Sequence, residues 1–269
     1  MEWGRGSTSF RKLIYLCRME GGIFGKFVNI KIKSKMKRKD FLVILISIIV
    51  LLPFFVSESV YQFYKDFNAE HSIIMSFIKF AVLSTFGECI GLRINTGVYN
   101  KRGFGILPRA MVWGGLGIVI GMAMTIFSSG VPAFLEKMGL ENANGIINGY
   151  FCGEKLFIAF CISVAMNSIF APVFMTFHKI TDTHILQTGG TLKGLFSKIH
   201  FVRILKELNW ERQCNFVFLK TIPLFWYPAH TVTFLLPEDM RVLFAALLGI
   251  VLGILLSIGA SSGKAKSKP

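Results

Sequence analysis

The chain has 269 residues, of which 53% are apolar or aromatic and only 17% are charged, whereas soluble globular domains contain about 25% charged residues. The formal net charge is +15, and the charges are clustered between long apolar runs. Several of these runs approach the roughly 20 residues that cross a hydrocarbon core about 30 Å thick. These features exclude an ordinary soluble enzyme, a disordered tail and a disulfide scaffold.

The first 40 residues form a predicted basic cytoplasmic arm that contains 11 lysine and arginine residues. An apolar run over 41–56 follows, and residues 57–59 (Ser-Glu-Ser) do not resemble the small-residue cleavage site of a secreted protein. The pattern therefore favours an uncleaved signal anchor. We expect the arm to lie on anionic lipid headgroups; the alternative is that translation starts at Met19 or Met36.

Six apolar segments predict an all-α, polytopic transmembrane bundle over residues 41–259. The second and fifth segments carry Lys79, Glu88 and Lys220, and the first contains Pro53. A short basic tail over 260–269 follows. The six segments are 41–56, 73–92, 110–131, 156–177, 215–236 and 242–257.

The distribution of lysine and arginine predicts the orientation, because cytoplasmic loops are enriched in both. With both termini inside, the inside segments 1–40, 93–109, 178–213 and 258–269 hold 11, 4, 6 and 3 basic residues, a total of 24. The outside loops hold four, which are Lys65, Lys137, Lys155 and Arg241. The basic excess is thus a topology signal, and a nucleic-acid partner is not expected.

Charged side chains inside a bilayer usually pair, because each costs about 2.5 to 3.5 kcal/mol at a helix centre. Glu88 and Lys220 lie at matched depths, roughly 7 to 9 Å below the inner interface at 1.5 Å per residue. We therefore predict an ion pair between Glu88 and Lys220. Asn167, a lone amide in the fourth segment, is expected to form an interhelical hydrogen bond.

The fifth segment is the most irregular. Pro223 and Pro228 each remove a backbone donor, with Trp226 between them and His230 just beyond. Irregular backbone at membrane depth is tolerated where it is buried or lines a wet cavity. These four residues are therefore a candidate pathway lining, and a purely structural kink is the favoured alternative.

Small residues four apart allow close helix approach in lipid. The pairs Gly87 and Gly91, Gly117 and Gly121, and Gly249 and Gly253 predict a compact bundle, and packing within one chain is favoured over dimerisation. In the inside loop over 178–213, apolar residues recur at spacings of three and four, which predicts a short interfacial helix or a loop helix packed on the bundle. They are Leu192, Leu195, Phe196, Ile199 and Val202.

The sequence offers no catalytic or metal constellation. The five cysteines form no CxxC pair, the five histidines are scattered, and Glu88 is the only carboxylate within the predicted spans. A catalytic site would need a nucleophile beside a base or paired carboxylates. We expect no enzyme activity, no metal and no cofactor.

Several short motifs resemble the Mpv-seventeen and peroxisomal-membrane-protein-twenty-two family. The C-terminal match is Trp226-x-Pro228-Ala229 followed by Phe234-Leu235-Leu236-Pro237-x-x-x-Arg241 and a closing Leu256-Ser257, and the upstream matches are Gly87-Glu88 and Gly105-x-x-Pro108 to Trp113. The residues that match the family pattern are Glu88, Pro108, Trp113, Trp226, Pro237 and Arg241.

The likeness spans about residues 86 to 257 and departs from the family pattern at Arg93 and Leu252. It implies a distant, bacterial-type member, although family members generally have four spans. It also implies a small integral membrane protein without a cofactor, proposed in some members to be a channel.

Taken together, these features predict a multi-pass protein of the bacterial cytoplasmic membrane. The first functional hypothesis is a passive channel or pore for ions or small solutes. The alternative is a structural or assembly protein without transport activity, and a homo-oligomer is compatible with either. Liposome leak assays separate the two hypotheses.

Overall fold

The computed structural model describes residues 36–266, with side chains up to residue 254, and this range contains helices and no strand. Residues 1–35 of the arm predicted over 1–40 lie outside the described residues, and α2 begins within the arm at Arg38. The tail predicted to begin at 260 is helical as far as Lys266. The helices are α2 (Arg38–Leu51), α3 (Pro53–Val56), α4 (Glu58–Glu70), α5 (Ser72–Thr96), α6 (Ile106–Lys137), α7 (Ala143–Asn148), α8 (Gly153–Gln187), α9 (Leu192–Leu195), α10 (Phe201–Glu207), α11 (Trp210–Arg212), the π-helix η1 (Gln213–Trp226), α12 (Tyr227–Leu235) and α13 (Glu238–Lys266).

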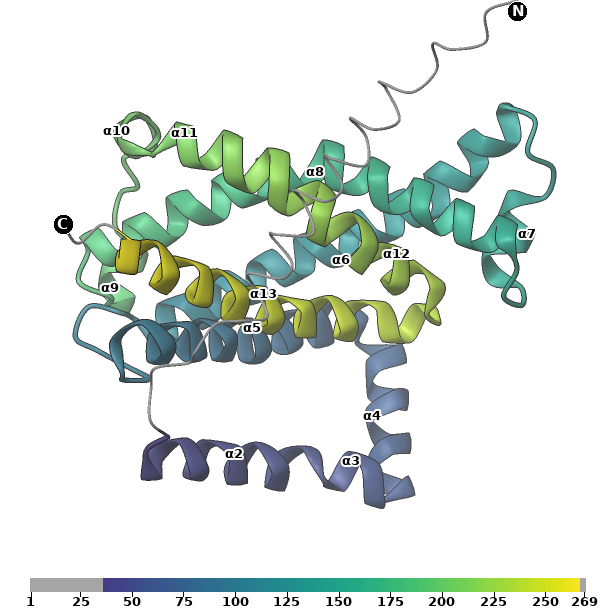
Figure 1. The fold of residues 1–269 in the computed structure, drawn as a ribbon. Coiled ribbons are helices and arrows are strands. Elements are labelled where there is room, and N and C mark those ends of the chain that lie inside the picture. Colours follow the sequence, from purple (N-terminus) through teal and green to yellow (C-terminus); the bar gives the residue numbers. More distant parts are fainter. Residues whose placement is uncertain (1–35, 267–269) are drawn as a thin grey trace, which may run out of the picture.

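The longer helical elements run along one common direction and alternate in sense (Figure 1). They are α2 with α3, α5, α6, α8, η1 with α12, and α13. Within the described residues, four stretches are long and apolar enough to cross a membrane: Arg38–Val56, Ser72–Thr96, Ile106–Lys137 and Gly153–Gln187. The first four predicted segments lie on these stretches, so the protein has the helices of a membrane protein.

Glycines let α5 pack closely against α6 and α13. A Cβ atom added to Gly87 would lie 2.9 Å from the Cα of Ile250, and one added to Gly253 would lie 3.2 Å from the carbonyl oxygen of Gly87. At the crossing of α5 with α6, a Cβ on Gly117 would lie 2.6 Å from the Cβ of Phe80. The predicted use of small-residue pairs within one chain is confirmed at these crossings.

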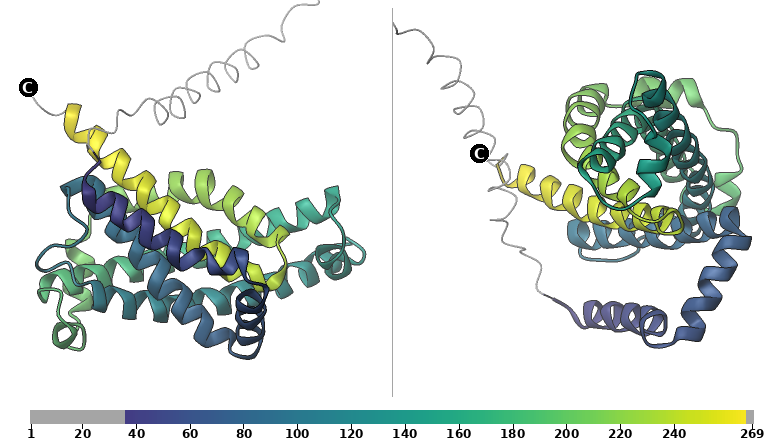
Figure 2. Two further views of the ribbon diagram at one scale, coloured as in Figure 1. Left: turned by 90° about the horizontal axis from the view of Figure 1, so that it is seen from below. Right: turned by 90° about the vertical axis from the view of Figure 1, so that its right-hand side faces the viewer.

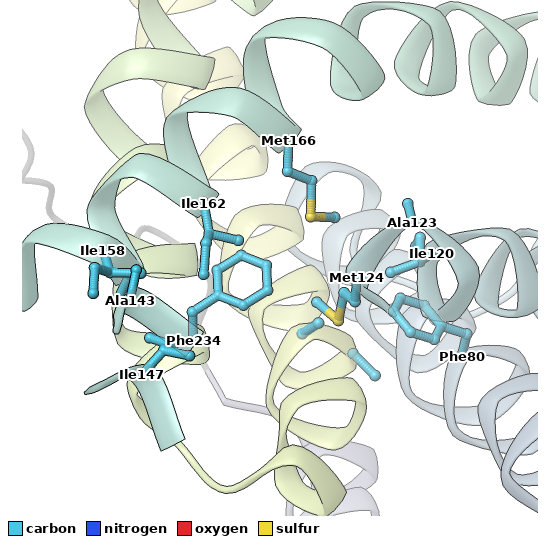
Figure 3. Packing of buried hydrophobic residues seen from close by; sticks show 13 residues of the cluster. Phe80, Ile120, Ala123, Met124, Ala143, Ile147, Ile158, Ile162, Met166 and Phe234 are labelled. Carbon is cyan, nitrogen blue, oxygen red and sulfur yellow. The ribbon is translucent and has the colours of Figure 1, made fainter. Parts of the chain in front are cut away.

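The hydrophobic core lies where α6, α7, α8 and α12 meet, and it extends to α5 and α13 (Figure 3). Phe234 of α12 is fully buried, and Figure 3 shows it beside Ile162 of α8 and Ile147 of α7. Phe80 of α5 lies near Ile120 on α6 in the same cluster. This packing joins α8 to α6, α7 and α12.

The first helix stands apart from the rest. α2 and α3 are separated from α5 by α4, which runs across the direction of the bundle (Figures 1 and 2), and none of the apolar window of Arg38–Val56 is buried. The N-terminal end of α2 is held by Asp40, which accepts hydrogen bonds from Arg93 (2.5 and 2.8 Å) and from the Tyr99 hydroxyl (2.8 Å). Burial and this carboxylate raise the pKa of Tyr99 above its ordinary value.

At the same end of the bundle, the loop between α5 and α6 contacts the turn after α8, backbone to backbone. Gly190 has a φ of +68°, and a Cβ on it would lie 2.7 Å from the nitrogen of Gly105 and from the carbonyl carbon of Gly103. Gly189 also has a positive φ, +73°, but has no neighbour within 4 Å of such a Cβ. Of these two glycines, Gly190 alone is therefore constrained by both backbone conformation and contact.

We expect Gly190→Ala to lower the free energy of unfolding by more than about 2 kcal/mol, because the left-handed conformation costs about 1 to 2 kcal/mol and the contact adds strain. Gly189→Ala is the matched control and carries only the conformational cost. Thermal unfolding of the full chain in detergent measures both. Equal losses in the two variants would contradict the close contact.

Candidate functional site

A buried ionic cluster joins α5, α6 and α8 at the end of the bundle that also holds the α5–α6 loop. The guanidinium of Arg109 on α6 forms ion pairs with Glu88 on α5 (2.6 Å) and with Asp182 on α8. Its Nε donates to the carbonyl oxygen of Phe104 (2.8 Å), and the Phe104 ring lies 4.4 Å from the guanidinium carbon. One arginine thus connects three helices, and its side chain is only 7% exposed.

Two aromatic nitrogen groups complete the surroundings of Glu88. The indole nitrogen of Trp113 donates to one carboxylate oxygen of Glu88 (3.0 Å), and Nε2 of His178 lies 3.4 Å from the same oxygen. The rings of Trp113 and His178 are in contact, with centroids 4.3 Å apart. Glu88 therefore has charged or hydrogen-bonding neighbours from two other helices.

Local sequence explains how the cluster forms. Pro108 lies in the first turn of α6, where a missing N–H breaks no helical hydrogen bond, and Arg109 follows it. His178 and Asp182 are four residues apart and so share one face of α8. Because α8 continues to Gln187, both residues belong to the helix and not to the loop predicted to start at 178.

The predicted ion pair between Glu88 and Lys220 is wrong. Glu88 pairs with Arg109, and Lys220 is exposed on η1. Matched depth was an insufficient criterion, because depth does not specify which face of a helix a side chain occupies. Proline followed by arginine just before the third segment was the available signal for the real partner.

A second polar group lies nearer the N-terminal end of α8, where this helix meets α12. Asn167 donates to the carbonyl oxygen of Ser163 (2.8 Å), and Nδ1 of His230 lies 3.0 Å from the Asn167 amide nitrogen and 3.1 Å from its oxygen. Ser163 in turn donates to the carbonyl oxygen of Tyr227 (2.8 Å). The predicted interhelical hydrogen bond of Asn167 is confirmed, and its partner is the buried His230.

The backbone around these residues is irregular, as the prolines predicted. Residues Gln213–Trp226 form a π-helix that contains Pro223, and the N–H of Tyr227 donates to the carbonyl oxygen of Ile222, five residues earlier. Pro228 lies in the first turn of α12. The indole nitrogen of Trp226 is buried without a hydrogen-bond partner, and its ring contacts that of His230 at 4.9 Å.

We expect Asn167→Leu to destabilise the protein by about 0.6 to 1.7 kcal/mol, which are the average and the largest values measured for hydrogen bonds between membrane helices. The substitution removes the amide that faces His230. The double variant Asn167→Leu with His230→Phe should recover part of the loss, because no polar ring is then left unpaired. Unfolding in detergent measures both, and a double variant less stable than additivity requires would contradict the contact.

The other motif residues have structural positions. Pro237 lies in the turn between α12 and α13, and its carbonyl oxygen accepts from the N–H of Met240 (3.0 Å). Arg241 is 7% exposed and donates from Nε to the carbonyl oxygen of Leu236 (3.1 Å), with its guanidinium 5.9 Å from the Phe234 ring. Arg241 thus resembles Arg109: in each, Nε donates to the carbonyl oxygen five residues earlier and the guanidinium lies near a phenylalanine ring.

The segment predicted as the loop over 178–213 does not contain the single short helix that was predicted there. Two short helices, α9 and α10, occupy the region, and residues 196–200 between them are not helical. The apolar spacing of three and four continues to Val202, but α9 already ends at Leu195 and α10 begins only at Phe201. Phe196 is 74% exposed and Val202 is 67% exposed, so the apolar character of the loop is nonetheless on its surface.

In the described part of the chain, Cys89, Cys152, Cys161 and Cys214 are free thiols, and no group of three metal-binding side chains occurs among these residues. Comparisons with protein-family models, with curated proteins and with solved structures find no match.

Proposed function

We propose that this is a six-span protein of the bacterial cytoplasmic membrane, with both termini inside, and that it conducts ions or small polar solutes passively. Four apolar helices support membrane insertion. The alternating directions of η1 with α12 and of α13 support two further spans (Figure 1). The inside-to-outside ratio of 24 to 4 basic residues supports the orientation.

The observation that carries the proposal is a line of polar side chains on one face of α8. Asn167 and His178 are eleven residues apart, about three turns or 16 Å, and so lie on the same face. Ionisable side chains within membrane spans are rare, and they mark substrate and ion pathways. Phe174, which packs against the core beside Phe170 at 5.3 Å, separates the two polar groups.

We infer that Phe174 is the constriction of this pathway. Phe174→Ser is expected to raise the leak of ions or small solutes from liposomes containing the purified protein by several-fold over wild type. Phe157→Ser is the matched control, because Phe157 lies on α8 and is 52% exposed. Fluorescent ion indicators and a graded series of trapped solutes provide the readout.

The alternative is a structural membrane protein, and the dense packing of α5 against α6 and α13 is the observation that favours it. Under this alternative, wild-type liposomes leak no faster than empty ones, and Phe174→Ser changes stability alone. Glu88→Ala provides a second comparison, because loss of the ionic cluster would then change folding without changing permeability.

The orientation has a separate test. We expect cysteines placed at Arg102 and at Glu141, in a background without the native cysteines, to be labelled from opposite sides of the membrane. Both positions are exposed at the two ends of α6. Labelling of both from one side would contradict the six-span arrangement.

The resemblance to the Mpv-seventeen and peroxisomal-membrane-protein-twenty-two family agrees with the proposal. Four of its six matching residues lie in or beside the two polar groups: Glu88, Pro108 and Trp113 at the ionic cluster and Trp226 beside His230. Membership as a distant, bacterial-type branch is therefore part of the proposal.

A further inference from the structure

The segment between α8 and η1 carries a surface cavity of about 730 Å³. Its lining combines the cations Lys198, Arg203 and Lys206 with the apolar Phe201 and Val202. The three cations are exposed, and they come from α10 and from the turn before it. The segment is thus a concave basic surface with an apolar edge.

The cavity has an excess of positive charge. Glu207 is the single carboxylate in the lining, and it pairs with the Nε of Arg203 at 2.9 Å. Three cations and one carboxylate leave a net charge of +2 without His200, which also lines the cavity. Such a site attracts an anion, and the attraction falls as salt rises.

The apolar edge identifies the kind of anion. Val202 is 67% exposed and Phe201 is 40% exposed, whereas Ile204 on the opposite face of α10 is fully buried. Phe201 also contacts Phe177 of α8, with ring centroids 6.3 Å apart. α10 is therefore fixed against the inner end of an apolar helix, with further apolar side chains directed away from the protein.

We propose that this cavity binds the phosphate group of an anionic phospholipid, with an acyl chain lying along Phe201 and Val202. Lys198, Arg203 and Lys206 supply the donors, and basic residues near a membrane surface each contribute about 1 kcal/mol to such binding. The site rests on the membrane placement proposed above but not on conduction, so a leak assay cannot decide it.

The test uses the full chain purified in a nonionic detergent. Native mass spectrometry counts bound phosphatidylglycerol and bound phosphatidylcholine with the same acyl chains. We expect wild type to prefer phosphatidylglycerol. The variant Lys198→Gln, Arg203→Gln, Lys206→Gln should bind this lipid at least about tenfold more weakly than wild type does. The control variant Lys101→Gln, Arg102→Gln, Lys193→Gln removes the same charge from exposed positions outside the cavity lining and should retain wild-type affinity.

Val202→Glu provides a second test that leaves the folded core intact, because Val202 is exposed. It should weaken phosphatidylglycerol binding by itself. The proposal would be overturned if the control triple variant lost as much phosphatidylglycerol affinity as the site triple variant. It would also be overturned if neither the site triple variant nor Val202→Glu bound this lipid more weakly than wild type. Displacement of the lipid by glycerol phosphate at equal concentration would also overturn it, because the site would then recognise a soluble phosphate.

Discussion

Arg109→Gln is expected to destabilise the protein by about 3 to 5 kcal/mol, the cost of breaking a buried ion pair from one side. The substitution leaves the carboxylates of Glu88 and Asp182 without the guanidinium that they share, and their side chains are only 19% and 15% exposed. It also removes the donor to the Phe104 carbonyl oxygen. Thermal unfolding in detergent, followed by circular dichroism, measures the loss.

Neutralising all three side chains separates the two causes of this loss, which are the unpaired carboxylates and the missing hydrogen bond to Phe104. The triple variant Glu88→Gln, Arg109→Gln, Asp182→Asn carries no unpaired charge and should recover much of the stability. Arg102→Gln, at an exposed arginine in the preceding loop, should change stability by no more than about 0.5 kcal/mol. If the triple variant is as unstable as Arg109→Gln, then the contact with Phe104 and not the charge is responsible.

Gly117→Leu is expected to cost about 3 kcal/mol or more, because overpacking at a close helix crossing forces backbone shifts. A Cβ on Gly117 would lie 2.6 Å from the Cβ of Phe80 and 2.7 Å from the carbonyl oxygen of Ser76. Backbone cannot move aside as a flexible side chain can. The expected result is separation of α5 from α6 and loss of folded protein after extraction.

Gly115→Leu is the matched control in the same helix. Gly115 is exposed and has no neighbour within 4 Å of an added Cβ, and leucine has a higher helix propensity than glycine by up to about 1 kcal/mol. This substitution should therefore be neutral or stabilising. A similar loss from both substitutions would show that the crossing of α5 and α6 is not where the structure places it.

Sequence patterns predicted the features that depend on the chain alone. Apolar runs identified the helices on which the first four segments lie, and the small-residue pairs identified the faces of α5, α6 and α13 that approach closely. Two prolines predicted the irregular backbone that became η1. Each of these depends on local composition and helical periodicity, which a sequence displays directly.

The ionic cluster could not be predicted in the same way. Charges end an apolar run but do not end a helix, so His178 and Asp182 were assigned to a loop although α8 continues past them. The choice of partner for Glu88 depends on which helices are neighbours and how each is rotated. α4 was also missed, although Ser57 caps its first turn through a hydrogen bond to the N–H of Val60 (3.5 Å).

The isolated position of α2 has a consequence for how the chain is assembled. Because none of the apolar part of this helix is buried against the residues that the structure describes, it contributes almost nothing to the cohesion of these other helices. A first span with a basic flank can nevertheless fix the orientation of everything that follows it. Direction and stability are thereby assigned to different parts of the polypeptide, and α5 to α13 can close around their own core whether or not the leading helix has yet taken its place.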